Sequence, residues 1–440
     1  MLRDAQGHAL SGATPEAATA FDRAVRAFTL VYGDTLGLYQ TARTAAPGSV
    51  MAHLGKAWAL SLASDPLLAA EARLLLESAR SLGCNEREAA HVAALTHAVE
   101  GHRAAAVQIL ERHLMSHPFD LIAHMAALQM DGHLGRFPLA RSRSMRALPR
   151  WSQAQPGYGI VLSFYAFALE EAGDYSRAEE TARAAAELEP HGYWPHHCVS
   201  HVMEMTGRPE MGLDWMVQRL PLWSAKENGN RVHIWWHKAL FHVELGQYAA
   251  ALDIYDGPIL AAMRAAALSI ANASSLLWRL QLLGCDLGGR WQQLATRWDG
   301  HADGRLYVFA DIHAAMTELA AGQPAALAKR LAAMRTTAAQ ACEAAALYRD
   351  IGLPLVEALA AFQQGAYAAA VERLLPARFE LWKMGGSQAQ RDVIDWTLAE
   401  AAARAGMRDV ALSLAHERLT MRPHSVPNRR WLQQAQGLAG

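Results

Sequence analysis

Glycines recur along the chain at a spacing that suits paired helices. Nine of them, each followed by an alanine-rich amphipathic run, lie 33 to 43 residues apart: Gly101, Gly135, Gly173, Gly207, Gly246, Gly289, Gly322, Gly365 and Gly406. A repeat in this range is typical of helix-turn-helix units that stack on their neighbours. Sustained alternation of apolar and polar residues, the mark of a half-buried strand, does not occur between the glycines. The sequence therefore predicts an all-α chain built from helical hairpins.

One hairpin shows which kind of repeat this is. Its string is Gly173-Asp-Tyr175, then Ala178, Ala182 and Ala185, and finally Pro190. This resembles the second half of a tetratricopeptide repeat, in which small residues lie where two helices touch and a proline closes the unit. We expect a right-handed α-solenoid of such hairpins.

The ends of the chain fit the pattern less well than its middle. Terminal units of a solenoid need a polar outer face, because each repeat buries its apolar side only against a neighbour. We therefore expect a tetratricopeptide-like array over residues 50–423, an N-terminal capping segment over 1–49 and a C-terminal cap over 424–440.

The charge balance, the cysteine pattern and the apolar runs of the sequence indicate which partners and which cell compartment to expect. Lys and Arg number 41 against 42 Asp and Glu, a formal charge of −1, which leads us to expect no nucleic acid partner. The four cysteines form no Cys-x-x-Cys pair, and no signal peptide or 18-residue apolar run is present. We expect a cytoplasmic protein without a membrane partner. The oligomeric state stays open.

Four further strings go beyond a generic repeat. They cover residues 194–205, 248–256, 349–355 and 385–393. Together they resemble the tetratricopeptide repeat protein 38 family, and the likeness runs from Leu2 to near the C-terminus. The resemblance implies an α-helical, cytosolic protein in which His197 and His201 belong to the family pattern. It implies no particular activity.

Histidines and acidic residues gather on the helix faces that should line the concave groove. In the usual repeat register, with the turn glycine at position 15, Gly207 puts His197, His201 and Glu204 at groove positions 5, 9 and 12. Their spacing of four and then three residues puts them on one helical face. Other polar or aromatic residues at or beside groove positions are His91, His124, His233, Trp236, His237, Asp311 and His313.

The first hypothesis for this groove is a metal centre. Two histidines four residues apart and a carboxylate can bind one divalent ion, zinc or iron, and leave positions open for water or substrate. The metal ligands would be His197, His201 and Glu204. The catalytic candidates are Glu204, His233, His237, Asp311 and Arg391, and the ligand-binding candidates are His91, His124, Trp236, His313 and Asp392.

Other interpretations of the same residues stay open. The histidines could line a pocket for a small ligand without a metal, or form a hydrogen-bonded network with no chemistry. The groove could instead hold a peptide or a partner protein, as in an interaction scaffold. Scaffolds that bind peptide carboxylates use Lys, Arg and Asn at positions where this chain has His, Glu and Trp. This difference favours a small-ligand site, with metal binding and catalysis both open, over that mode.

Overall fold

The computed structural model describes residues 2–63, 65–301 and 307–438. It confirms the all-α class: the described residues form antiparallel helical hairpins, and β pairing among them is limited to two isolated bridges, Arg3 with Ala9 and Tyr32 with Asn228. The chain divides into two compact units. The first comprises residues 1–199 and 221–231, and the second comprises 200–220 and 232–440. The predicted division into two caps and one array stays a prediction.

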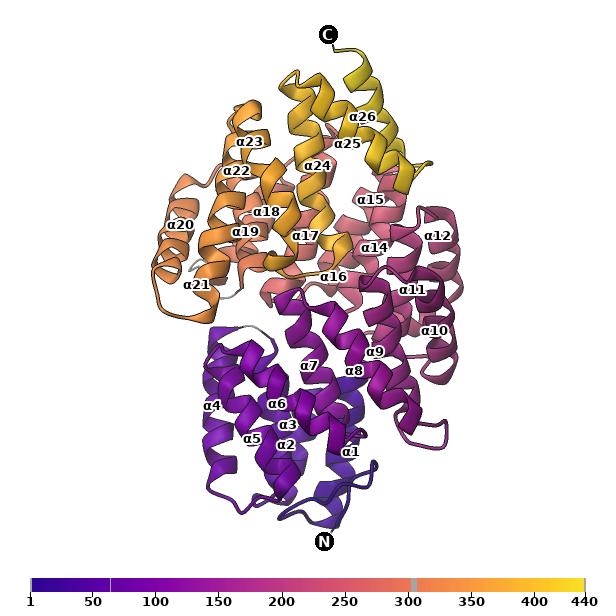
Figure 1. The fold of residues 1–440 in the computed structure, drawn as a ribbon, viewed down its shortest axis with the longest axis vertical. Helices are drawn as coiled ribbons and strands as arrows, with labels where there is room; N and C mark the ends of the chain where they lie inside the picture. Colours follow the sequence, from indigo (N-terminus) through magenta and orange to yellow (C-terminus); the bar gives the residue numbers. More distant parts are fainter. Residues whose placement is uncertain (1, 64, 302–306, 439–440) are drawn as a thin grey trace. The chain divides into compact units, whose positions relative to one another are not determined.

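Successive helices of the first unit pair as hairpins and lie side by side (Figure 1). They are α1 (Pro15–Leu30), α2 (Thr35–Ala45), α3 (Val50–Ser61), α4 (Pro66–Arg80), α5 (Glu86–Val99), α6 (Arg103–Ser116), α7 (Leu121–Leu134), α8 (Phe137–Ala147) with the short 3₁₀ turn η1 (Leu148–Arg150), α9 (Tyr158–Glu171) and α10 (Tyr175–Leu188). Helix α11 (Tyr193–Met205) begins in this unit and ends in the second, and α13 (Leu220–Trp223) also belongs to both.

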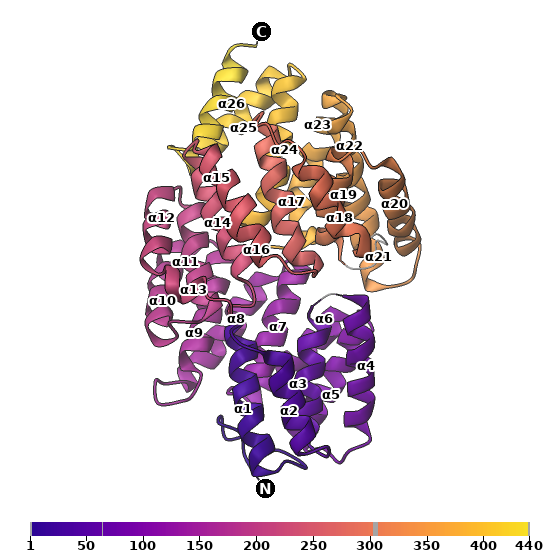
Figure 2. The same ribbon diagram turned by 180° about the vertical axis from the view of Figure 1, so that it is seen from behind.

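The second unit continues the hairpins and is seen well from behind (Figure 2). Its larger helices are α12 (Pro209–Gln218), α14 (Arg231–Glu244), α15 (Tyr248–Ile254), α17 (Ala267–Leu282), α18 (Arg290–Trp298), α19 (Val308–Ala320), α20 (Pro324–Ala338), α22 (Leu353–Gln363), α23 (Tyr367–Ala377), α24 (Gln388–Arg404), α25 (Arg408–Met421) and α26 (Val426–Gln436). Shorter pieces are η2 (Tyr255–Ile259), α16 (Leu260–Ala262), η3 (Asp299–His301), α21 (Glu343–Leu347), η4 (Tyr348–Gly352) and η5 (Arg378–Met384).

Eight of the nine predicted turn glycines adopt a positive φ, a backbone conformation that residues other than glycine rarely adopt. At Gly207, φ is +65°, and the backbone N–H groups of Gly207 and Arg208 donate to the carbonyls of Glu204 and Met203. Gly289 is the exception. It has a negative φ directly before α18, and Gly284 takes the left-handed position after α17, so this connection is longer than the spacing predicted.

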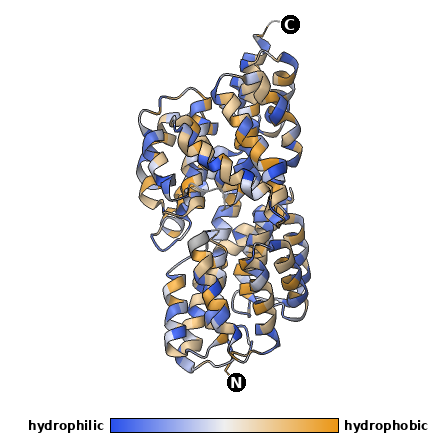
Figure 3. Ribbon diagram, turned by 90° about the vertical axis from the view of Figure 1, so that its left-hand side faces the viewer, coloured by the Kyte–Doolittle hydropathy of each residue, from blue (hydrophilic) through white to orange (hydrophobic). Residues whose placement is uncertain are grey.

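Alanines allow the two helices of a hairpin to approach closely. In α10, Ala178, Ala182 and Ala185 are fully buried, as the repeat pattern predicts. Apolar and polar residues both occur along the helices of the two units (Figure 3), and helices such as α7 and α9 are buried on nearly every side.

Within the second unit, the C-terminal helices pack back onto earlier ones. Helix α24 packs on α17, where Trp278 Nε1 donates to Thr397 Oγ1 at 2.9 Å. Arg279 Nη2 donates to the carbonyl of Ala389, also at 2.9 Å. The side of α17 that carries Trp278 and Arg279 is therefore covered by α24.

No described helix has both the length and the apolar character needed to cross a bilayer.

The turn at Gly207 offers a stability prediction. A Cβ added there would lie 3.1 Å from Cα of Arg422, whereas at Gly406, which has a similar φ of +69°, it would meet nothing within 4 Å. We expect Gly406→Ala to cost about 1 kcal/mol from backbone strain alone. Gly207→Ala should cost clearly more, about 2 kcal/mol or above, because backbone must move.

Urea unfolding followed by tryptophan fluorescence measures both values. Equal costs for the two variants would mean that the approach of Arg422 to this turn is not tight.

Candidate functional site

Two helices of the second unit bring five of the predicted site residues together. Helix α11 supplies His201 and Glu204, and α14 supplies His233, Trp236 and His237. Glu204 lies three residues after His201, and Trp236 and His237 lie three and four residues after His233, so each set lies on one side of its helix. We call the three imidazoles with Glu204 the histidine cluster.

A chain of polar contacts runs through the cluster. His237 Nδ1 lies 2.9 Å from Glu204 Oε2, and His237 Nε2 lies 3.3 Å from His233 Nε2. His233 Nδ1 lies 2.5 Å from Asn272 Oδ1, on helix α17.

Asn272 determines which atoms donate and which accept along this series of contacts. Its amide nitrogen donates to the carbonyl of Leu268 at 2.8 Å, which turns its oxygen toward His233. His233 Nδ1 must therefore donate, and the lone pair of its neutral ring lies on Nε2. That lone pair points at the Nε2 of His237.

The third imidazole lies close to the other two. The His201 ring centroid is 4.5 Å from that of His237 and 6.3 Å from that of His233. One ring nitrogen of each of these three histidines lies within 4.8 Å of those of the other two. Trp236 stacks on His233 with centroids 5.1 Å apart and ring planes 12° from parallel, which fixes the ring orientation.

The cluster is sealed from water. His201 and His237 are 0% exposed, and Glu204 and His233 are 5% exposed. Burial raises the pKa of Glu204 to about 7, although Arg422 and His201 oppose the rise. Burial also lowers the pKa of His233 to about 3, against the bond to Asn272. The imidazole of His233 is therefore neutral at neutral pH.

Arg422, which directly follows α25, acts electrostatically on Glu204 and binds Asp392. Its Nη1 lies 2.8 Å from Asp392 Oδ2 and 3.5 Å from Glu244 Oε1, and its Nη2 lies 3.6 Å from Met205 Sδ. Arg418 also binds Asp392 at 2.7 Å. Burial alone would raise the pKa of Asp392, but the two guanidinium groups hold it well below its usual range. Asp392 thus fastens the C-terminal hairpin to α24.

His197 lies one helical turn before His201 in α11, in the part of that helix that belongs to the first unit. Within that unit its ring stacks on Tyr193, with centroids 4.7 Å apart, and packs against Phe167 at 5.0 Å. Its predicted share in a metal site stays a prediction.

His91 belongs to a separate network in the first unit. Asp120 Oδ2 accepts from Arg87 Nε at 2.6 Å, from His91 Nε2 at 2.9 Å and from His113 Nε2 at 3.1 Å. Trp58 Nε1 donates to the other nitrogen of His91. Both nitrogens of His91 are thus used, and no lone pair is left for a metal. We interpret this network as structural.

The other ligand-binding candidate of the first unit, His124, also has a partner within the protein. It is 3% exposed, and its Nε2 donates to the carbonyl of Pro118 at 2.9 Å.

Three predicted residues of the second unit have partners outside the cluster. Asp311 binds Arg330 at 2.6 Å through one oxygen and accepts from the Tyr348 hydroxyl at 2.6 Å through the other. His313 Nδ1 donates to the carbonyl of Phe309. Arg391 donates to the carbonyl of Gly386.

Sequence reasoning missed the residues that orient the cluster. Asn272 and Arg279 interrupt the apolar helix α17, and both are buried. The guanidinium of Arg279 lies 5.4 Å from the centre of the Trp236 ring. A buried amide and a buried guanidinium in an apolar helix were the available signal, since such groups are rarely buried without a partner. Nothing in the sequence says that the partners lie on α14 and α24.

Comparisons with known proteins add little beyond the fold. No family model matches the chain. It is similar to a monomeric mutant of IFIT1 solved with Gppp-AAAA, at 14% identity and a TM-score of 0.45, over 97% of this chain and 96% of that one. It is also similar to the human IFIT1 dimer with m7Gppp-AAAA, at 14% identity and a TM-score of 0.46, over 96% of this chain and 95% of that one.

The exclusion of nucleic acid from the partner classes is wrong. The IFIT1 structures just named contain Gppp-AAAA and m7Gppp-AAAA. The inference from net charge was also unsound, because a net charge of −1 hides a local excess of positive charge. Residues 132–169 contain five arginines and no Asp or Glu. An average over 440 residues therefore does not exclude an anionic partner.

The buried histidines of the first unit predict a loss of stability in acid. Burial lowers the pKa of His124 from 6.5 to about 4. Below pH 6.5 the unfolded chain binds a proton here that the folded one does not, so stability falls as the pH drops from 6.5 to 4. The shift corresponds to about 3 kcal/mol for this side chain.

His124→Gln keeps a hydrogen-bond donor but cannot titrate. The fall in its unfolding free energy between pH 7 and pH 4, measured by urea titration, should be smaller than that of the wild type by about this amount. Parallel pH curves for the two proteins would rule out a neutral, buried His124.

Proposed function

We propose that the protein is a metal-binding helical-repeat protein whose ion is held by His201, His233 and His237. The observation that carries the proposal is the convergence of one ring nitrogen from each of these three residues within 4.8 Å. Imidazole nitrogen suits zinc, iron, copper and nickel, and zinc and iron are the ions we favour.

The spacing of two of the nitrogens supports this. Zinc–nitrogen bonds of about 2.0–2.1 Å in a tetrahedral set separate neighbouring ligand nitrogens by about 3.3 Å. His233 Nε2 and His237 Nε2 are 3.3 Å apart. The same distance is slightly long for a hydrogen bond between nitrogens. The pair is thus spaced as ligands of one ion without any change of backbone.

The outer contacts of the same rings support it as well. A histidine that binds a metal usually donates its other N–H to a carboxylate or a carbonyl oxygen, which orients the ring and makes it a better ligand. His237 has Glu204 at its Nδ1, and His233 has Asn272 there. Glu204 would therefore act behind His237 and not as a ligand itself, which departs from the role that the sequence predicts for it.

The purely structural alternative fits a different part of the molecule. In the Asp120 network, both nitrogens of His91 are bound to protein groups, which leaves nothing for an ion. In the histidine cluster, the Nε2 lone pair of His233 faces a second imidazole. The two clusters use the same residue type, but the latter suits a cation.

Burial decides what such an ion would do. Because the histidines are at most 5% exposed, an ion here would exchange little with water, and its direct effect would be to tie α11 to α14. A zinc or iron ion supplies Lewis acidity when a coordination position is open. The chain's own contribution is the dry, oriented set of imidazoles.

The protein should therefore bind about one zinc ion per chain, with tighter binding than an isolated pair of histidines can give. We would measure metal content by mass spectrometry after gentle purification, then titrate zinc calorimetrically into chelator-treated protein. His237→Ala and His233→Ala should each weaken binding at least about 100-fold. Asn272→Ala, which removes only the orienting contact, should weaken it about 10- to 100-fold.

His242→Ala is the matched control, because His242 lies on the same helix but pairs with Gln247 away from the cluster. It should bind zinc as the wild type does. Cobalt substitution gives an independent readout, since a tetrahedral nitrogen set produces strong visible absorption. Wild-type protein that takes up neither zinc nor cobalt would end the proposal, whatever the variants do.

A further inference from the structure

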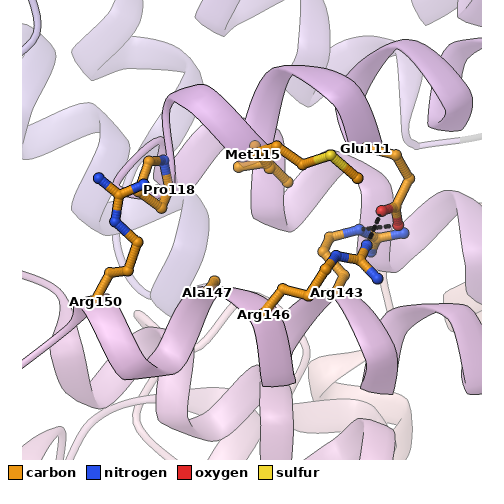
Figure 4. A pocket seen from close by; sticks show the side chains of 8 residues that line it. Glu111, Met115, Pro118, Arg143, Arg146, Ala147 and Arg150 are labelled. Carbon is orange, nitrogen blue, oxygen red and sulfur yellow. Dashed lines mark hydrogen bonds and ion pairs between the residues drawn. The ribbon is translucent and has the colours of Figure 1, made fainter.

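The first unit contains a pocket that none of the sequence hypotheses used. It has room for about 150 Å³, equivalent to about five waters. One helical face of α6 lines it with Glu111, Leu114 and Met115, and Pro118 follows that helix. The opposing face comes from α8 and η1, with Arg143, Arg146, Ala147 and Arg150 (Figure 4).

Charge is distributed unevenly around this pocket. At one end, Glu111 binds Arg143 at 2.7 Å and also binds Arg146 (Figure 4). At the other end, Arg150 lies beside Pro118 and is exposed. Arg146 lies in the last turn of α8 and Arg150 in the 3₁₀ turn η1 that follows it, and both line the pocket.

Two of the three arginines already have carboxylate partners. Arg143 is 3% exposed and also pairs with the buried Asp131, so its charge is balanced within the protein. Arg146 keeps 47% of its side chain exposed while it binds Glu111 through one nitrogen, Nη2. Guanidinium groups have five N–H donors each, and most of those of Arg146 and Arg150 remain available to an external oxyanion.

Glu111 shows what kind of group fits this end of the pocket. Its carboxylate oxygens bind two guanidinium groups at once, as a phosphate oxygen pair would. The side chains between the two charged ends are apolar: Leu114, Met115, Pro118 and Ala147. A ligand would need an anionic group carrying more than one charge and a compact apolar body beside it.

We infer that this pocket binds a phosphate monoester, with the exposed side chains of Arg146 and Arg150 turning toward one another over Ala147 to hold the phosphate and the attached group against Met115 and Pro118. A dianionic phosphate has three oxygens for the two guanidinium forks, whereas a carboxylate has two and a single charge. The inference does not depend on the histidine cluster, which lies in the other unit. The local excess of arginine over residues 132–169 favours entry of an anion.

Phenyl phosphate is the probe that matches this chemistry, titrated calorimetrically into the full-length protein at low salt. Arg150→Ala and Arg146→Ala should each weaken binding about tenfold, the usual worth of a charged hydrogen bond. Glu111→Gln should strengthen binding, because the competing internal carboxylate is gone. Benzoate, of similar body but a single charge, should bind at least about tenfold more weakly.

Arg141→Ala is the matched control, since it removes the same charge from the same helix outside the pocket lining. It should leave affinity within about twofold. An equal loss in Arg141→Ala and Arg150→Ala would show diffuse attraction and overturn the proposal. Equal binding of benzoate would overturn the phosphate class.

The source of the phosphate is tested with a 5′-phosphorylated tetranucleotide and its unphosphorylated form. Tighter binding of the phosphorylated form, lost in Arg150→Ala, supports the pocket as a site for a terminal phosphate. Equal binding of both forms, with no binding of phenyl phosphate, would mean that the arginines bind a nucleic-acid backbone and would contradict a monoester site.

Discussion

The pairing of buried polar side chains is the constraint on which the rest of this structure depends. Each hairpin turns one face inward, and in this chain those faces carry histidines, carboxylates and arginines as well as alanine and leucine. A buried charge without a partner costs several kcal/mol, so the helices must meet where partners exist. Arg422 illustrates this, because it reaches Glu244 and Asp392 from the end of α25 and so fixes how the C-terminal hairpin returns onto earlier helices.

The two histidine-rich networks show that residue type does not decide function. Around Asp120, one carboxylate oxygen accepts from Arg87, His91 and His113, and Trp58 uses the remaining nitrogen of His91. In the histidine cluster, Asn272 takes one N–H and thereby leaves a lone pair aimed at another ring. A metal needs lone pairs that converge, and this depends on what stands behind each imidazole.

How much of the fold and of the site could be predicted from the sequence depends on how far apart in the sequence the interacting residues lie. Turn glycines act locally, so the hairpins were predictable, and Gly289 failed only because Gly284 ends the preceding helix. The convergence of His201, Glu204, His233 and His237 followed from helical spacing on neighbouring hairpins. The partners Asn272 and Arg422 lie 39 residues from His233 and 217 residues from Met205, and no local pattern specifies such pairs. The net charge of the whole chain was a poor guide to its partners, because averaging over 440 residues hides the arginine-rich segment 132–169.

Arginine serves two purposes in this chain, and burial separates them. Arg330, which is fully buried, binds Glu318 with two nitrogens and Asp311 with a third, so all three of its nitrogens hold α20 to α19. Arg146 keeps half of its side chain in solvent while binding one carboxylate. The buried group is out of reach of a ligand, whereas the exposed one is accessible. A guanidinium can bind a ligand only when the fold leaves some of its N–H donors accessible. Helices α6 and α8 create this condition for Arg146 beside Glu111.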